Sequence, residues 1–165
     1  MIKINKKLSI LALLLSSLSL TACNEDSTEQ VIKQAVAIEK SDGCHLCGMI
    51  IEGFPGPKGQ LFNKTSDISH KFCSTRDLFG FLLQPENVRQ VKEVYVHDMS
   101  KTPWQKPTDE FFINAKDAWF IIGSSKNGAM GETIASFSQQ ADANAFSKEF
   151  GGKLYRFSEI TIDII

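Results

Sequence analysis

The stretch Phe72-Cys73-Ser74-Thr75-Arg76-Asp77-Leu78-Phe79-Gly80-Phe81-Leu82-Leu83 predicts an amphipathic helix that follows a strand-rich region. Ser74 and Asp77 have the spacing of a capping box, with Asp in place of the usual Glu. The apolar residues that follow recur at helical spacing, and Pro85 ends the pattern because proline disrupts a helix interior. The stretch therefore predicts a helix that begins at Ser74 and buries one face.

The spacing of this stretch recurs later in the chain. Phe, Asp and Phe stand at offsets of zero, five and nine in two places, at residues 72, 77 and 81 and again at residues 137, 142 and 146. Two amphipathic helices could share this spacing by chance, and a duplication is the other explanation. A duplication predicts an α+β fold of two similar small halves, about 41–90 and 91–165, each with antiparallel strands and one helix.

The remaining elements follow from β-branched and aromatic runs and from turn residues. Strands are expected at residues 47–52, 60–63, 91–99, 118–122, 154–157 and 160–164. A second helix is expected over residues 139–150, and Gly151-Gly152 caps its C-terminus.

The N-terminus has the pattern of a secretory signal. Lys3, Lys6 and Lys7 precede the apolar run Leu8–Leu20. This run is shorter than the roughly 20 residues that a bilayer-spanning helix needs. A cleaved signal peptide over residues 1–22 is therefore predicted, and an uncleaved anchor helix is the less favoured alternative.

The end of that run, Leu20-Thr21-Ala22-Cys23, resembles the bacterial lipobox. The resemblance implies that Cys23 is lipidated and anchors the mature chain on the periplasmic side of a membrane. Asn24 stands where an Asp is associated with inner-membrane retention, which favours the outer membrane. The polar residues 23–40 are expected to form a flexible tether, and residues 41–165 to form the folded domain.

Charge excludes one class of function. The chain carries 18 basic and 19 acidic residues, and residues 1–22 contain three lysines and no acid. The mature chain therefore has 15 basic and 19 acidic residues, a net charge of −4. This balance lacks the basic surface of a nucleic-acid-binding protein, so no nucleic acid is expected as a partner.

Three cysteines remain after Cys23 is assigned to the lipid: Cys44, Cys47 and Cys73. The number is odd and the compartment is oxidising, so at least one thiol has no internal disulfide partner. Cys73 near a helix N-terminus could be reactive through a lowered pKa, or it could be buried and inert.

The motif Cys47-Gly48-Met49 places a thiol and a thioether two residues apart, on one side of an extended segment. These soft ligands select copper(I). Alternatives remain open: Cys44 and Cys47 could form a disulfide or half of a zinc site, and Met49 could simply fill the core. The zinc alternative is weakened because the chain has no second pair of spaced ligands.

Two further motifs carry candidate metal ligands. His97 and Met99 share one face of the expected strand 91–99, so they could point into one pocket. Met130 lies between small residues in Gly128-Ala129-Met130-Gly131, where its sulfur would be accessible.

The motifs Cys47-Gly48-Met49-Ile50, Phe72-Cys73, Tyr95-Val96-His97-Asp98-Met99 and Gly128-Ala129-Met130-Gly131 stand in the order that resembles the NosL family. The resemblance implies copper(I)-binding lipoproteins that help to assemble the copper centres of nitrous oxide reductase. It also implies an α+β fold of two related halves that resembles organomercurial lyase. The copper ligands it implies are first Cys47 with Met49. Met130 and His97 are the next candidates, and Met99 is the last.

These observations favour a copper(I) metallochaperone rather than an enzyme. The resemblance implies as partners nitrous oxide reductase or its maturation factors, and an upstream copper donor or transporter. The alternative function is a thiol-disulfide redox protein that uses Cys44 and Cys47. The alternative is weakened because this pair precedes a Gly-Met segment and not an amphipathic helix.

Overall fold

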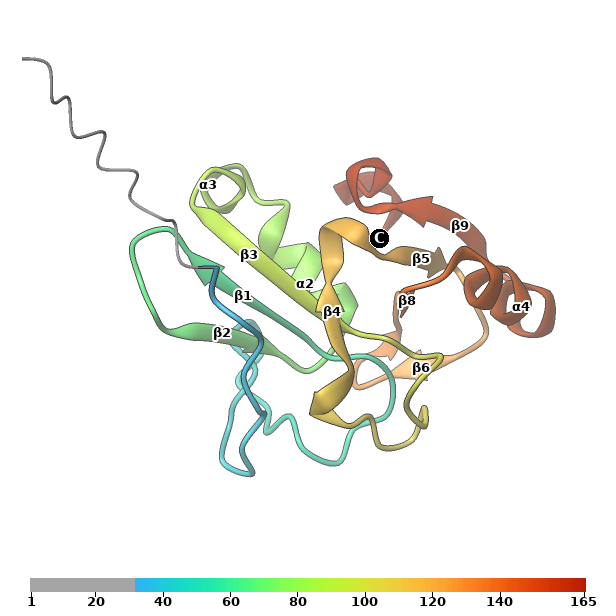
Figure 1. The fold of residues 1–165 in the computed structure, drawn as a ribbon, viewed down its shortest axis with the longest axis horizontal. Helices are drawn as coiled ribbons and strands as arrows, with labels where there is room; N and C mark the ends of the chain where they lie inside the picture. The colour runs from blue at the N-terminus through green and yellow to red at the C-terminus, as the bar shows by residue number, and fades with distance from the viewer. Residues whose placement is uncertain (1–31) are drawn as a thin grey trace, which may run out of the picture. The chain divides into compact units, whose positions relative to one another are not determined.

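The structure is a computed structural model that describes residues 32–165 (Figure 1). The predicted signal peptide, the lipidated Cys23 and the tether up to Val31 lie outside the described residues. Within residues 32–165, every helix is too short or too polar to cross a bilayer.

The first sheet has four antiparallel strands in the order β2-β1-β3-β4 (Figure 1). These strands are β1 (Gly59–Asn63), β2 (Ser69–Phe72), β3 (Val91–His97) and β4 (Phe112–Asn114). The expected strands 60–63 and 91–99 are therefore confirmed as β1 and β3, with small changes at their ends.

The second sheet has three antiparallel strands in the order β8-β5-β9. These strands are β5 (Trp119–Ile122), β8 (Ala135–Phe137) and β9 (Lys153–Arg156), and a separate hairpin joins β6 (Asn127–Gly128) to β7 (Gly131–Glu132). Because β3 and β4 pair with the first sheet, the change from one sheet to the other falls after Asn114 and not near residue 90.

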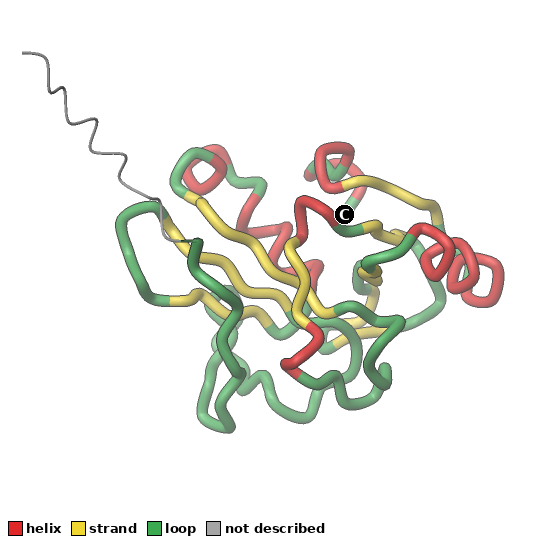
Figure 2. The backbone as a smooth tube through the Cα atoms, in the orientation of Figure 1, coloured by secondary structure: helices red, strands yellow, loops and turns green. Residues whose placement is uncertain are grey.

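Residues 32–165 contain three α-helices: α2 (Thr75–Leu82), the short α3 (Pro85–Val88) and α4 (Gln140–Phe150) (Figure 2). Short 3-10 turns occur at η1 (Asp109–Phe111), η2 (Ala115–Asp117), η3 (Phe157–Glu159) and η4 (Ile162–Ile164). Helix α2 follows the edge strand β2, and helix α4 follows the edge strand β8. In each repeat of the Phe-Asp-Phe spacing, the first Phe is the last residue of the edge strand, and the Asp and the second Phe lie in the helix. The α+β architecture with antiparallel sheets is confirmed; the resemblance to organomercurial lyase stays a prediction.

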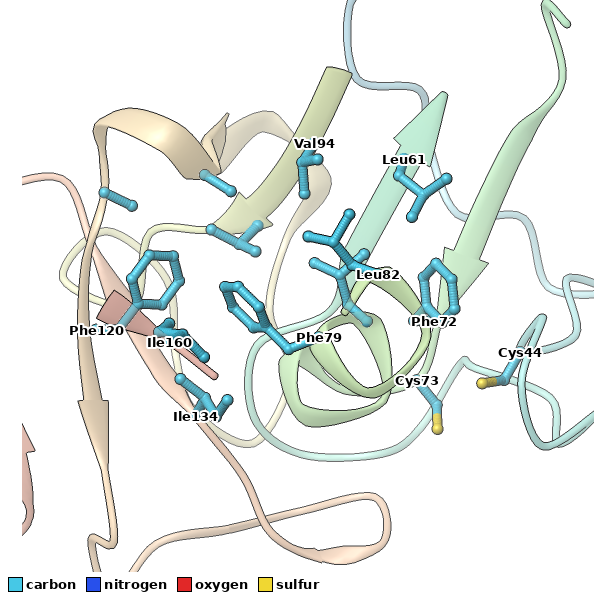
Figure 3. Packing of buried hydrophobic residues seen from close by; sticks show 14 of the residues in the cluster. Cys44, Leu61, Phe72, Cys73, Phe79, Leu82, Val94, Phe120, Ile134 and Ile160 are labelled. Carbon is cyan, nitrogen blue, oxygen red and sulfur yellow. The ribbon is translucent and has the colours of Figure 1, made fainter. Parts of the chain in front are cut away.

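Helix α2 lies between the two sheets and contributes to one shared core (Figure 3). Its Leu78 packs so closely on β1 that a Cβ at Gly59 would meet the leucine side chain at 2.6 Å. On the side of the second sheet, the Phe79 ring meets Phe120 edge to face, with centroids 5.2 Å apart. Burial of large aromatic side chains of this kind dominates the stability of a small core.

A second apolar cluster lies where α4 covers the other face of the β8-β5-β9 sheet. Ile121 and Phe137 supply the sheet side of this cluster, and Ala143 with Phe146 supplies the helix side. Met99 packs against the same cluster.

Three segments differ from the sequence-based expectations. Residues 47–52 form a loop with a single bridge between Gly43 and Ile50, because Gly48 adopts a positive φ of 74° that an extended strand does not have. The end of the chain, where a strand was expected at 160–164, forms the 3-10 turn η4.

The third difference concerns the part of the expected tether that the structure describes. The backbone N–H and C=O of Val36 pair with the buried Gln60 amide of β1, at 3.0 and 2.9 Å. The backbone N–H of Ile38 donates to Asp109 at 2.8 Å. Since these bonds hold residues 33–38 against the sheet, a flexible tether stays a prediction only for residues before Ile32.

Candidate metal centre

Three cysteine sulfurs and one carboxylate converge beside the N-terminus of α2. The ligand atoms of Cys44, Cys47, Cys73 and Asp77 all lie within 4.8 Å of one another. Figure 3 shows the sulfurs of Cys44 and Cys73 at the edge of the shared core, beyond Phe72. We call these four residues the sulfur cluster.

The loop that carries two of these sulfurs is held by its own backbone. The N–H of Cys44 donates to the Met49 carbonyl and the N–H of Gly48 donates to the Cys44 carbonyl, each at 2.8 Å. The N–H of His45 donates to the carbonyl of Lys71 on the edge strand β2, at 2.7 Å. This last bond places the loop beside Cys73, which directly follows β2.

Helix capping positions the other two groups. The Ser74 hydroxyl accepts from the N–H of Asp77 at 3.0 Å, which confirms the predicted N-cap. In a full capping box the acid would reach back to the N-cap N–H. Here the Asp77 carboxylate instead accepts from the Cys73 thiol, with sulfur and oxygen 2.9 Å apart.

The environments of the thiols differ. Burial, followed by the hydrogen bond and the charge of Asp77, raises the pKa of Cys73 far above its ordinary value, so this thiol keeps its proton. Burial also acts to raise the pKa of Cys44, but hydrogen bonds from the N–H groups of Cys47 and Cys73 outweigh it and lower that pKa. The cluster thus combines a favoured thiolate with a protonated thiol.

The third thiol faces solvent. Cys47 is exposed, and its sulfur lies 3.6 Å from that of Cys73. Two large apolar side chains of the same loop are also exposed, Leu46 by 51% and Ile50 by 50%. A soft metal ion could therefore enter and leave through Cys47 without unfolding the loop.

Met130 lies at the exposed tip of the β6-β7 hairpin, 57% exposed, as its small neighbours predicted. One contact of this hairpin and one of the segment just after it reach the first turn of α2, which carries Asp77 of the sulfur cluster. Glu132 forms an ion pair with Arg76 at 3.2 Å, and the Thr75 hydroxyl donates to the Ile134 carbonyl.

The structure separates His97 from Met99. Strand β3 ends at His97, and the N–H of Met99 donates to the carbonyl of Ser136 on β8 at 2.9 Å. The alternation of a strand does not continue through Asp98, so Met99 packs in the cluster under α4 while His97 points elsewhere. The expectation that the two side chains share one pocket is therefore wrong.

Both ring nitrogens of the buried His97 are occupied. Nδ1 accepts from the N–H of Lys58 at 3.1 Å, and Nε2 faces the Asp109 carboxylate at 3.3 Å. Burial lowers the pKa of His97 even though Asp109 acts to raise it, so the neutral ring donates to Asp109 through Nε2. The ring also stacks on Phe112, with centroids 4.0 Å apart.

Sequence analysis did not bring Cys44, Cys73 and Asp77 together with Cys47. One signal was present: Cys73 and Asp77 stand four apart at the start of the predicted helix, the spacing of neighbours on a helix face. The approach of the loop 43–50 to this helix depends on the backbone bond from His45 to Lys71, which no local pattern encodes.

Comparisons with known proteins agree with this architecture. The NosL family model matches residues 35–165. The copper-binding lipoprotein NosL of Stutzerimonas stutzeri is 45% identical over 152 residues, which cover 92% of this chain and 78% of that protein. The protein of the same name from Achromobacter cycloclastes is 32% identical over 145 residues, covering 86% of this chain and 74% of that protein.

Two solved structures are also similar. The crystal structure of the copper chaperone NosL from Shewanella denitrificans superposes with a TM-score of 0.79 at 65% identity, covering 80% of this chain and 98% of that one. The solution structure of apo-NosL from Achromobacter cycloclastes gives a TM-score of 0.50 at 29% identity, covering 64% of this chain and 86% of that one.

Proposed function

Since the chain belongs to the NosL family, we propose that it is a copper(I) metallochaperone that delivers copper for assembly of the copper centres of nitrous oxide reductase. The observation that supports this function best is the sulfur cluster, in which several thiols meet and one of them is open to solvent. Soft thiolate and thioether ligands favour copper(I) over harder ions.

The proposed ligands are the thiolates of Cys44 and Cys47, with the thioether of Met49 or Met130 as the additional donor. Cys44 is favoured because its thiolate is already stabilised by backbone N–H groups. Cys73 keeps its proton for Asp77 and is not proposed as a primary ligand. His97 and Met99 are left out of this set, because one is fully hydrogen bonded and the other is packed under α4.

Transfer follows from the exposure of Cys47. A ligand of the acceptor protein can approach the copper ion from the solvent side and share it with Cys47 while Cys44 still holds it from inside. A closed site with four protein ligands would lack this open position. The arrangement thus suits a carrier that must release its ion, and not an enzyme that retains one.

The proposed place and partners follow from the sequence. Lipidation of Cys23 would hold the chain on the periplasmic side of a membrane, with the outer membrane favoured by Asn24. Nitrous oxide reductase or its maturation factors would receive the copper, and a donor or transporter upstream would supply it.

The test is an anaerobic copper(I) titration of the reduced chain against a competing chelator. Cys47→Ser is expected to lower the affinity by at least about a hundredfold, because a thiolate is lost from the site. Met99→Leu is the matched control and should leave the affinity unchanged. An unchanged affinity in Cys47→Ser would exclude Cys47 as a ligand.

One observation also favours a redox role, which is the second candidate function. The sulfurs of Cys44 and Cys47, the pair expected from the sequence, lie within 4.8 Å of each other, and those of Cys47 and Cys73 lie 3.6 Å apart. Exchange with an external disulfide, which would accept the two electrons and the two thiol protons and leave as two thiols, could join either pair. A measured reduction potential distinguishes the candidates. A dithiol that exchanges quickly with a disulfide and has no copper(I) affinity would support the redox protein, whereas copper loading that requires prior reduction would support the chaperone.

A further inference from the structure

Two histidine rings lie together at the surface, next to the sulfur cluster but outside it. His45 belongs to the loop 43–50 and His70 to the edge strand β2, and their ring centroids are 4.1 Å apart with the planes tilted by 46°. The backbone bond from His45 to Lys71 holds the loop at this position. The pair is therefore fixed by the same contact that brings the loop to Cys73.

The ring nitrogens of this pair are largely free. Among the described residues 32–165, neither nitrogen of His45 has a hydrogen-bond partner, and His70 has one only at Nε2. That partner is the side-chain amide of Asn63, 3.3 Å away. His97 differs, because both of its nitrogens are engaged inside the protein.

A hollow of about 400 Å³ opens beside the two rings, lined also by Val36, Asp42 and Lys71. The Asp42 carboxylate is paired with the Lys71 ammonium and accepts from the N–H of Glu39 at 2.6 Å. The lysine charge is thereby neutralised within the hollow. The remaining volume has room for a hydrated ion.

Aromatic packing explains why rings lie at positions 45 and 70, but it does not explain why both rings are imidazoles. Phe81 meets the His45 ring edge to face at 4.9 Å and lies 6.3 Å from the His70 ring. Phenylalanine at positions 45 and 70 can make the same ring contacts, and at position 70 it loses only the hydrogen bond to Asn63. Two imidazoles with three nitrogens that have no partner among residues 32–165 add the ability to bind a metal, since neutral imidazole is the commonest metal ligand in proteins.

We propose that His45 and His70 bind a divalent transition-metal ion, for which copper(II) is the probe, with water molecules completing its coordination. Imidazole suits copper(II) and zinc, whereas the thiols nearby select copper(I). Asn63 would act as a positioning residue: a flip of its amide lets the oxygen accept from Nε2 of His70, so that Nδ1 faces the metal. This site does not depend on the proposed chaperone function.

The test uses the full chain, loaded anaerobically with one equivalent of copper(I) and then titrated with copper(II). Copper(I) is silent in electron paramagnetic resonance, so the spectrum reports copper(II) alone. We expect one bound equivalent with hyperfine coupling to imidazole nitrogen. His45→Phe and His70→Phe should each lower the copper(II) affinity at least tenfold, while Val36→Ala, which alters the same hollow without removing a nitrogen, should not.

A second arm separates this proposal from the chaperone function. The triple variant Cys44→Ser, Cys47→Ser, Cys73→Ser removes the thiols and should still bind copper(II) with the same nitrogen coupling. Retained copper(I) affinity in His45→Phe and His70→Phe shows that these variants are folded. The double variant His45→Phe, His70→Phe decides the proposal. If it binds copper(II) as tightly as the unchanged chain does, the histidine site is overturned, whatever its copper(I) affinity.

Discussion

The sulfur cluster and the pocket around His97 both contain side chains of metal-binding types, but these side chains differ in their exposure and in their existing hydrogen bonds. In the cluster, Cys47 is exposed and the Cys44 sulfur accepts weak backbone hydrogen bonds. In the other pocket, both nitrogens of His97 are committed to Lys58 and Asp109 and the ring is 1% exposed. The comparison teaches that ligand type alone does not identify a site: at least one donor must also be reachable from solvent, as Cys47 is in the sulfur cluster.

The largest expected effect is on the sulfur side of this comparison. Changing Cys44 and Cys47 together to Ser should lower copper(I) affinity by at least about a thousandfold, because both proposed thiolates are lost. A competition titration measures the change. Cys73→Ser is the control and should cost much less, because that thiol keeps its proton for Asp77. A greater loss in Cys73→Ser than in the double variant would reverse the proposed roles.

The next effect is that of pH on the same affinity. The folded state lowers the pKa of Cys44, so its thiolate persists above that pKa and is lost as the pH falls through it. Below the pKa of a ligating thiol, copper(I) must displace the thiol proton before it can bind. Each such proton lowers the copper(I) affinity by about tenfold for every pH unit of acidification. Titrations from pH 9 to pH 5 should therefore show falling affinity toward acid. A flat profile would exclude thiolate ligation.

A third prediction concerns the His97 side. His97→Phe keeps the stacking on Phe112 but leaves the Lys58 N–H without its acceptor. Asp109 loses the His97 ring but keeps the N–H of Ile38. We expect the free energy of unfolding to fall by about 1–3 kcal/mol, the usual cost of one unsatisfied buried polar group. Urea denaturation measures this loss. Copper(I) affinity of the folded variant should stay the same, and a large decrease would place His97 among the ligands.

The smallest expected effect distinguishes the two methionines. Met130→Leu removes an exposed thioether near the first turn of α2, and Met99→Leu removes one packed under α4. We expect Met130→Leu to speed copper(I) transfer to the chelator by a factor of about two to ten, because the loss of a thioether, a weaker ligand than a thiolate, loosens the hold on the ion only modestly. Stopped-flow transfer to a chelator measures both variants. Equal rates in Met130→Leu and the unchanged chain would remove Met130 from the ligand set.

Local signals predicted much of the fold. Ser74 and Asp77 identified the start of α2, and Gly151 at φ 77° ends α4 as its position predicted. These features depend on neighbouring residues only. Expectations that depended on contacts distant in sequence were less successful. Strand β3 ends at His97, and the N–H of Met99 bonds to the carbonyl of Ser136 in the second sheet, a contact that alternation in the sequence cannot reveal.

The site shows the same limit. Cys47 and Met49 were recognisable from one short motif, but the meeting of Cys44 and Cys47 with Cys73 depends on a loop that packs against a strand edge more than twenty residues away. Gly48 illustrates the point: its positive φ turns the chain, so the segment that resembled a strand instead folds around the cysteines.

X-ray absorption spectroscopy of the chain carrying one equivalent of copper(I) tests the central claim most directly. If the ion lies in the sulfur cluster, the copper is surrounded by sulfur alone, and the spectrum of His97→Phe is identical to that of the unchanged chain. A shell of imidazole nitrogen that disappears in His97→Phe, with the sulfur signal unaffected by loss of Cys44 and Cys47, would contradict the account.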